Sequence, residues 1–304
     1  MRPAPARSAG RQDRRRTLAP RHPGWNPSLH LHRPGCRDGA SVGACAVPLH
    51  SRPVTPSDAP PVPQRCAHCG LRASGAFHQL AASELGFIED LRSATERVPA
   101  GHVLIREQAD GGRLYTLYAG WAFRYKTLSD GRRQILNFLL PGDFFGLQQR
   151  FSEGATYGVE ALTEASVCVF QGKRLWELYR AQPRLGYDLT WLCAREEQML
   201  DENLLTTGRR SAMERVAVLL IHLFKRLQRL GLVAEDNSCA FPLTQQHMAD
   251  ALGLSLVHTH RTLRRLQALG LHSLEDGRLL LRNPRALTQL ADYAAQPLEK
   301  LPLL

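Results

Sequence analysis

The chain lacks the long apolar run that a membrane-spanning helix needs. None of its 304 residues belongs to a stretch of ~20 consecutive apolar side chains. The N-terminus is Arg-rich but has no apolar core of the kind that a secretory signal carries. The seven cysteines are irregularly spaced, which is not the pattern of a disulfide framework. These absences predict a protein of the reducing cytoplasm with no membrane partner.

Enzyme signatures are also missing from the sequence. There is no nucleophile elbow, phosphate-binding loop, HExxH motif or pair of closely spaced catalytic carboxylates. Asp143 and Glu160 are isolated carboxylates, and His102 and His222 have no evident partners in the sequence. We therefore expect a binding protein and not an enzyme.

Most of the net positive charge lies in the first 65 residues. The whole chain has a formal charge of +11, and residues 1–65, with 11 Arg and 3 Asp, contribute +8 of it. The same segment holds 12 of the 19 prolines and few large apolar side chains, so it cannot bury enough surface to offset its ordering entropy. We expect residues 1–65 to be a disordered tail. Any argument for nucleic-acid binding must therefore come from local residues and not from the net charge.

Short β-type runs follow, between Val98 and Phe170. Glycine-containing turns separate them: Ala100-Gly101, Gly111-Gly112, Ser129-Asp130-Gly131 and Pro141-Gly142-Asp143. Evenly spaced short strands with such turns predict a β-roll or sandwich, and Gly120 marks a bend in the sheet. We assign residues 66–182 to a β-roll domain that opens with a short helix over 80–91.

A long helix is expected from Pro183 to about Thr206, and we expect Gly208 to break it. One set of positions recurs at alternating steps of four and three: Leu185, Leu189, Leu192, Glu196, Met199 and Asn203. Such spacing is typical of a coiled-coil seam, here with polar residues at two positions. We interpret residues 183–208 as a dimerisation helix that pairs with its own copy. The alternative is a long helix packed on the β-roll.

Residues 209–293 begin with an amphipathic helix over 211–230 and then contain two short helices joined by a tight turn. Thr244 can cap the first short helix, Gly253 ends it, and Ser255 caps the second, which runs over 256–269. We expect Ala249 and Gly253 to let the two helices cross closely.

The second short helix has an apolar face and a basic face. Helical spacing turns Thr259, Leu263 and Leu266 inward. The outward face carries Val257, His260, Arg261 and Arg264. Two leucine-rich runs then flank Glu275-Asp276-Gly277-Arg278, which is a β-hairpin signal. A helix-turn-helix followed by a hairpin predicts a winged DNA-binding module whose second helix enters the major groove.

In this order, the β-roll, long helix and winged helix-turn-helix form an α+β chain that resembles the CRP/FNR family of bacterial transcription regulators over about residues 66–293. The resemblance implies a cyclic-nucleotide-binding-like roll and a homodimer on a two-fold symmetric double-stranded DNA operator. It also implies that the state of the roll controls DNA binding, and that the protein contacts RNA polymerase. Residues 294–304 would be a C-terminal tail.

The family's three base-reading positions fall on Val257, His260 and Arg261. Arg261 matches the family's arginine, which suits a bidentate contact with guanine. Val257 departs from the family, because many members have a glutamate there. We expect this difference to give the protein an operator of its own. Three further residues are expected to contact the DNA backbone: Thr244, Arg264 and Arg265.

The residues argue against cyclic nucleotide as the effector. The family's nucleotide binders use a glutamate for the ribose and an arginine for the phosphate, and here these positions hold Leu147 and Ala155. A cyclic phosphate would lose its charge-assisted partner. Cyclic nucleotide is therefore the disfavoured effector.

An iron–sulfur cluster or another metal is an alternative that the resemblance suggests. Cys66 and Cys69 have chelating spacing, and Cys168 matches the family's distant cluster cysteine. The oxygen sensors of the family need a further cysteine near position 75, which is Gly75. A tetrathiolate site is therefore incomplete unless His68 or His78 supplies a ligand.

Other modes of control stay open. The thiols of Cys66 and Cys69 could be oxidised directly, or the roll could bind an unknown small effector. Four basic residues could meet an anionic ligand or form a solvated face: Arg124, Lys126, Arg132 and Arg133. In a different functional class, the roll would be the cyclic-nucleotide-type regulatory module of an enzyme.

Overall fold

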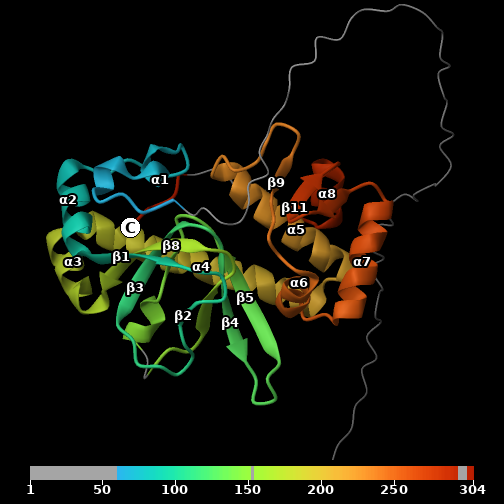
Figure 1. Ribbon diagram of the computed structural model, residues 1–304, viewed down its shortest axis with the longest axis horizontal. Coiled ribbons are helices and arrows are strands. Elements are labelled where there is room, and N and C mark those ends of the chain that lie inside the picture. The colour runs from blue at the N-terminus through green and yellow to red at the C-terminus, as the bar shows by residue number, and fades with distance from the viewer. Residues whose placement is uncertain (1–59, 152–153, 294–299) are drawn as a thin grey trace, which may run out of the picture. The chain divides into compact units, whose positions relative to one another are not determined.

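The computed structural model describes residues 60–151, 154–293 and 300–304 (Figure 1). The chain divides into two units, residues 1–52 and 53–304, and every described residue belongs to the second. The predicted tail over residues 1–59 lies outside the described ranges. Residues 60–64, which we placed in that tail, contact the β-roll. The carbonyl of Pro60 accepts a hydrogen bond from Ser166 Oγ at 2.8 Å, and that of Pro63 accepts one from Arg92 Nη1 at 3.0 Å.

Two four-stranded antiparallel sheets form the predicted roll. The first has the strand order β1-β8-β3-β6 and the second has the order β2-β7-β4-β5. Their bounds are β1 Arg92–Val98, β2 Val103–Ile105, β3 Arg113–Ala119, β4 Ala122–Thr127, β5 Arg133–Leu139, β6 Phe144–Phe145, β7 Gly158–Ala161 and β8 Ala165–Gln171.

The core of the roll lies between these sheets and is built from alternate strand residues. Tyr115 and Phe145 stack there with ring centroids 5.1 Å apart. Gly120 occupies the bend between β3 and β4 with φ of +86°, and a Cβ at this position would lie 2.3 Å from the carbonyl oxygen of Glu164. Only glycine meets both constraints, so the bend that the sequence indicated depends on this residue.

Short helices cover one end of the roll. A 3₁₀ turn, Cys66–His68, leads into α1 (Gly70–Ala73) and α2 (Ala82–Leu91), and α3 (Leu175–Ala181) follows β8. Ile88 of α2 and Leu178 of α3 are 2% exposed and share a core with Leu185 and Leu189 of the next helix. The long helix therefore begins inside the core of the β-roll domain.

That next helix, α4, spans Pro183–Arg209. It continues through Gly208, where we expected a break, because a single glycine lowers helix stability only by about 1 kcal/mol. The helix ends at Arg209, because the backbone of Arg210 is extended. Among the described residues, no helix is both long and apolar enough to cross a membrane.

The C-terminal module consists of four helices and a small sheet. The helices are α5 Ala212–Arg229, α6 Gln245–Leu252, α7 Leu256–Ala268 and α8 Pro284–Leu290. The sheet has the strand order β10-β11-β9, with β9 Ser238–Ala240, β10 His272–Glu275 and β11 Arg278–Leu281. The apolar face of α5 supplies the centre of its core, where Val216, Leu220 and Phe224 are at most 1% exposed. The module contains the predicted helix-turn-helix and wing (Figure 1).

Candidate nucleic-acid interface and sensor cavity

The turn between α6 and α7 is set by local backbone chemistry. The Thr244 hydroxyl accepts a hydrogen bond from His247 N at 3.2 Å and caps α6, and Ser255 Oγ accepts one from His258 N at 3.2 Å and caps α7. Gly253 ends α6 with φ of +62°. A Cβ at Gly253 would have Arg215 Nη1, 4.0 Å away, as its nearest neighbour. The glycine is therefore needed for its left-handed backbone and not, as we expected, for a close helix crossing.

The two faces of α7 are separated as its spacing predicts. Thr259 and Leu266 are fully buried against α5 and α6, and Leu263 is 6% exposed. The opposite face is exposed along the whole helix. An exposed helix face that begins at a tight turn, in a module with a wing, has the geometry of a recognition helix.

The three positions that the resemblance assigns to base reading all lie on this exposed face. Val257 is 68% exposed and can offer only apolar contact. His260 Nδ1 lies 3.1 Å from Gln245 Oε1. This contact uses Nδ1 and leaves Nε2 of the ring free to donate or to accept a hydrogen bond. Arg261 makes no hydrogen bond or ion pair with any described residue, so its five donors are open.

The residues expected at the DNA backbone flank this face. Arg264 and Arg265 are exposed and form no ion pair within the part of the chain that the structure describes. Thr244 is exposed, and its oxygen already accepts the capping bond, which leaves its O–H free to donate. All three groups can therefore act as donors toward phosphate.

The wing is a tight hairpin closed by two residues with positive φ. Asp276 has φ of +49° and Gly277 has φ of +70°, which fits a two-residue turn that matches the twist of β10 and β11. The sequence indicated this hairpin but not its third strand, β9, which pairs with β11 through Leu279 and Cys239. β9 is only three residues long, which is too short to show a period of its own.

The first helix of the helix-turn-helix lies against the roll. Arg133 Nη2 of β5 forms an ion pair with Asp250 Oδ2 of α6 at 3.1 Å, and Gln134 Nε2 donates to the carbonyl of Ala251 at 3.0 Å. The rings of Phe123 and His247 are 5.6 Å apart in the same contact. The β4–β5 hairpin and the DNA-reading module are thus connected by side chains on both sides.

The 4–3 face of α4 that we expected to meet a second copy faces the roll of its own chain. Leu185 and Leu189 are fully buried there, and Leu192 is partly buried beside them. Further along, Glu196 pairs with Arg124, and Asn203 Nδ2 donates to the carbonyl of Leu136 at 2.8 Å. Met199 Sδ lies 4.0 Å from Asn137 Nδ2. Intrachain packing therefore uses these side chains.

The opposite face of α4 is exposed and also follows alternating steps of three and four. It contains Tyr187, Thr190, Ala194, Glu197, Asp201 and Leu204. Tyr187 is 70% exposed and Leu204 is 72% exposed. We name this set the outer face of α4. A helix period gives the same signal for both faces, so the sequence alone did not distinguish them.

A cavity of about 600 Å³ lies between the roll and α4, a volume typical of a small-molecule site. Its apolar wall consists of Phe144, Phe145, Leu147, Phe151, Leu192 and Leu200. Tyr157, Glu196 and Glu197 add polar groups, while Gln148 and Thr156 bond to each other at 2.7 Å. Leu147 and Ala155, at the nucleotide-binding positions of the family, bring no charge. Among the described side chains, carboxylates and no basic group line the cavity, which disfavours an anionic nucleotide.

Three of the four basic residues of the β4–β5 hairpin have protein partners, and Lys126 is exposed. Arg124 is 1% exposed, pairs with Glu196, and has its guanidinium 4.1 Å from the centre of the Tyr157 ring. Arg133 pairs with Asp250, and Arg132 pairs with Asp130 at 2.8 Å. Of the two interpretations that the sequence left open, neither an anionic ligand site nor a plain solvated face describes Arg124.

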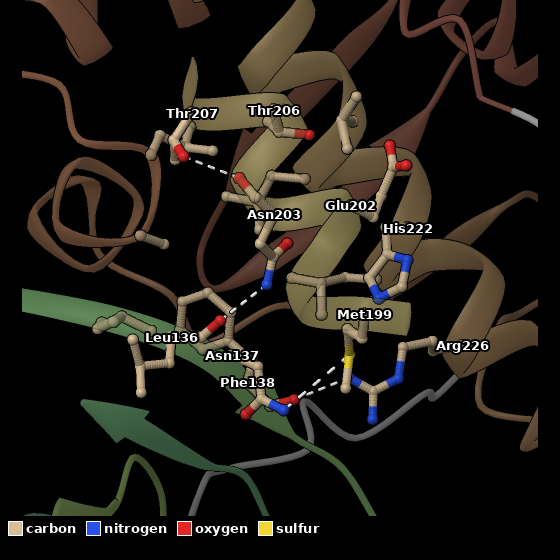
Figure 2. A pocket seen from close by; sticks show the side chains of 16 residues that line it. Leu136, Asn137, Phe138, Met199, Glu202, Asn203, Thr206, Thr207, His222 and Arg226 are labelled. Atoms are coloured by element: carbon tan, nitrogen blue, oxygen red, sulfur yellow. Dashed lines mark hydrogen bonds between the residues drawn. The ribbon is translucent and has the colours of Figure 1, made fainter. Parts of the chain in front are cut away.

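A smaller cavity, of about 50 Å³, lies where β5, α4, α5 and α6 meet (Figure 2). Figure 2 shows Asn203 and Met199 of α4 pointing toward Leu136 and Asn137 of β5, with His222 and Arg226 of α5 beside them. Its volume suffices for a few waters and not for an organic effector. The polar bonds around it join the roll to α4.

The structure brings the three candidate metal-binding cysteines together, although Cys69 and Cys168 are 99 positions apart in the sequence. Cys66 and Cys69, at the N-terminal 3₁₀ turn, and Cys168 of β8 line one cavity of about 20 Å³. Burial raises the pKa of the Cys168 thiol to about 11 and also raises the pKa of the Cys66 thiol. Arg72 and Arg92 line the same cavity and would repel a metal cation.

The remaining donors do not complete a metal site. His68 is exposed, and His78 Nε2 lies 3.2 Å from Asp188 Oδ2. Within the described ranges, no group of three or more His, Cys, Asp or Glu side chains is arranged to hold a metal ion. Protonated thiols beside two guanidinium groups do not fit an iron–sulfur cluster or a zinc site, so we derive no function through a metal.

Two domain families match this chain. The cyclic nucleotide-binding domain matches residues 95–182, and the Crp-like helix-turn-helix domain matches residues 214–290. Their order along the chain is the order of the roll and the winged module described above.

Relatives and solved structures agree with these matches. The nitrogen fixation regulation protein FixK of Bradyrhizobium diazoefficiens is 30% identical over 74% of this chain and 93% of its own length. The transcriptional activator protein FnrL of Cereibacter sphaeroides is 30% identical over 74% of this chain and 90% of its own. The structure of FixK2 from Bradyrhizobium japonicum superposes with a TM-score of 0.60 at 29% identity, over 66% of this chain and 98% of that one.

The chain therefore belongs to the CRP/FNR family, and it is a DNA-binding transcription regulator. The α+β architecture and the family resemblance that the sequence predicted are confirmed.

Proposed function

We propose that the protein works as a homodimer that reads a two-fold symmetric operator through Val257, His260 and Arg261 of α7. The observation that carries this proposal is the exposed face of α7, where Arg261, without a partner among the described residues, lies beside an apolar Val257 and a histidine whose Nδ1 contacts Gln245. Arg261 can donate twice to guanine, while Nε2 of His260 can donate to or accept from the edge of a neighbouring base. Thr244, Arg264 and Arg265 add backbone contacts.

The outer face of α4 supports the dimer part of the proposal. Two copies of α4 that pair along Tyr187, Ala194 and Leu204 would bury apolar side chains that are exposed in the single chain. The six residues of the 4–3 face described above, which we call the inner face of α4, then hold each helix to its own roll. This arrangement places two recognition helices about one DNA turn apart.

The large cavity supports control by an uncharged or cationic apolar effector. Its wall is aromatic and aliphatic, and Glu196 and Glu197 are the charged groups among the described residues that line it. Glu196 also binds Arg124, so a ligand there would touch the contact between roll and helix. Contact with RNA polymerase is an expectation from the family alone. We further propose that the protein acts by binding and has no catalytic turnover.

Selection from random double-stranded DNA tests the proposal. Wild-type protein should enrich an inverted repeat with half-sites about one helical turn apart. Arg261→Ala should keep the repeat and lose discrimination at one base pair per half-site, at a cost of ~1–3 kcal/mol. Arg285→Ala, on α8, serves as the matched control. Enrichment of sequences without symmetry, or equal loss of affinity for all DNA, would contradict base reading by Arg261.

A further inference from the structure

Residues 301–304 belong to the segment that we assigned to a C-terminal tail. They lie in a groove formed by the first described residues of the chain. We name Leu301–Leu304 the strap and residues 66–78 the cap. Leu301 N donates to the carbonyl of Ala76 at 2.9 Å, and His78 N donates to the carbonyl of Leu301 at 3.0 Å. Phe77 and Leu301 thereby form a parallel β-bridge. The C-terminal residues lie beside the N-terminal helices (Figure 1).

The rest of the strap is held by both polar and apolar contacts. Arg72 Nη2 donates to the carbonyl of Leu303 at 3.0 Å, and Thr116 Oγ1 donates to that of Leu304 at 2.6 Å in a buried position. The side chains of Leu303 and Leu304 are 3% and 7% exposed. A buried backbone carbonyl that finds a specific partner, together with buried leucines on either side, is the pattern of a built peptide site.

Two thiols form part of the wall of this groove. Cys69 packs against the cluster of Ala76, Phe77 and Leu303, and Cys66 belongs to the cluster that contains Leu304. The cavity that remains between the thiols and the strap is only about 20 Å³. Cys66 is buried and Cys69 is partly exposed, so an adduct on the Cys66 thiol has no room while both leucines are seated.

The groove also touches the DNA-binding module. Leu230, which directly follows α5, packs against the same cluster as Cys69 and Leu303. The strap comes after α8 in the chain. The cap thus contacts the winged module through Leu230 and also binds the segment that follows this module in the sequence.

We propose that the cap is a binding groove for the chain's own Leu-Pro-Leu-Leu segment, and that covalent modification of Cys66 or Cys69 expels this segment and changes operator affinity. The second half rests on the proposed DNA-reading function. The modifying agent is an electrophile of the class that adds to thiols. A maleimide is a suitable probe: the thiol sulfur bonds to a ring carbon, the ring C=C bond becomes single, and the thiol proton ends on the neighbouring carbon.

The first experiment measures the rate at which N-ethylmaleimide labels Cys66 and Cys69 in the full chain, by peptide mass mapping. Leu303→Asp/Leu304→Asp should raise this rate at least ~10-fold, because the two leucines cover the thiols. Leu128→Asp, at an exposed leucine of the roll, is the matched control and should leave the rate unchanged. Thr116→Val removes only one hydrogen bond of the strap, so it tests the groove without a new charge and should give an intermediate rate. Equal rates in all four proteins would overturn the groove.

The second experiment measures operator affinity before and after labelling. In the wild type, labelling should change the dissociation constant ~5-fold or more, which is the usual scale of allosteric coupling. In the strap variant, labelling should cause no further change, and in Cys66→Ser/Cys69→Ser it should cause none. A full change in the strap variant would show that coupling bypasses the strap. A wild type that binds no operator would contradict the proposed function, whereas the labelling rates would still decide the groove.

Discussion

Glu196 of α4 forms an ion pair with Arg124 of β4, and this pair joins the long helix to the β-roll. Arg124 is 1% exposed and has its guanidinium over the ring of Tyr157. Burial raises the pKa of the Glu196 carboxyl, and the charge of Arg124 opposes that rise. Glu196 and Tyr157 also line the large cavity, so a molecule in that cavity would lie against this ion pair.

Arg124→Met should therefore destabilise the protein. The change removes one partner of a buried pair and leaves Glu196 without its counter-charge, at a cost of about 3 kcal/mol. We take the low end of the usual range because the Glu196 side chain is 30% exposed. Urea unfolding followed by circular dichroism would measure it. Arg132→Met, which breaks an exposed pair, should change stability by less than ~1 kcal/mol. Similar losses for both variants would contradict a structural role for the Arg124 pair.

Local signals explain why the DNA-reading half could be predicted from the sequence. The caps at Thr244 and Ser255, the left-handed position at Gly253 and the Asp276-Gly277 turn each depend on neighbours within a few residues. Burial of Thr259 and Leu266 follows from the helical period. Such features can be inferred without knowing how the chain folds at longer range.

The inner face of α4 and the strap could not be predicted in this way. Helical periodicity predicts that Leu185, Leu189 and Leu192 share a face. It does not predict whether that face contacts the roll or a second chain. The bond between Thr116 and Leu304 joins positions 188 residues apart, and a four-residue segment has no period. Arg124 is part of a run that alternates like any other strand, and only the fold brings Glu196 to it.

Val257→Glu should change which base the protein prefers. The side chain is 68% exposed at the start of α7, so a glutamate fits without repacking. A carboxylate accepts from cytosine N4 or adenine N6, whereas valine can only touch a methyl group. Selection from random DNA should show a new preference for cytosine or adenine at one position per half-site, worth ~1–3 kcal/mol. An unchanged consensus would mean that Val257 does not face a base.

Leu204→Asp should make the protein monomeric in sedimentation. Leu204 lies on the outer face of α4 and is 72% exposed, so an aspartate there would leave the single chain intact and place two charges at the proposed seam. Leu192→Asp is the informative comparison, because Leu192 packs against the core that α4 shares with the β-roll domain. We expect that change to lower stability before it affects association. A stable dimer of Leu204→Asp would refute the outer-face seam.

His272→Leu should flatten the pH dependence of stability on the acid side of neutrality. His272 is 1% exposed in β10, its Nδ1 has no hydrogen-bond partner in the described chain, and burial lowers its pKa from 6.5 to about 4. Between these two pH values, His272 binds a proton in the unfolded chain and stays neutral in the folded chain. The contribution of His272 to the free energy of unfolding is therefore fully present above pH 6.5. It falls on acidification by up to ~1.4 kcal/mol per pH unit. Thermal or urea unfolding between pH 7 and pH 4 should show this loss in the wild type and in His68→Leu, an exposed control, and a smaller loss in His272→Leu. Parallel curves for all three proteins would show that His272 does not contribute.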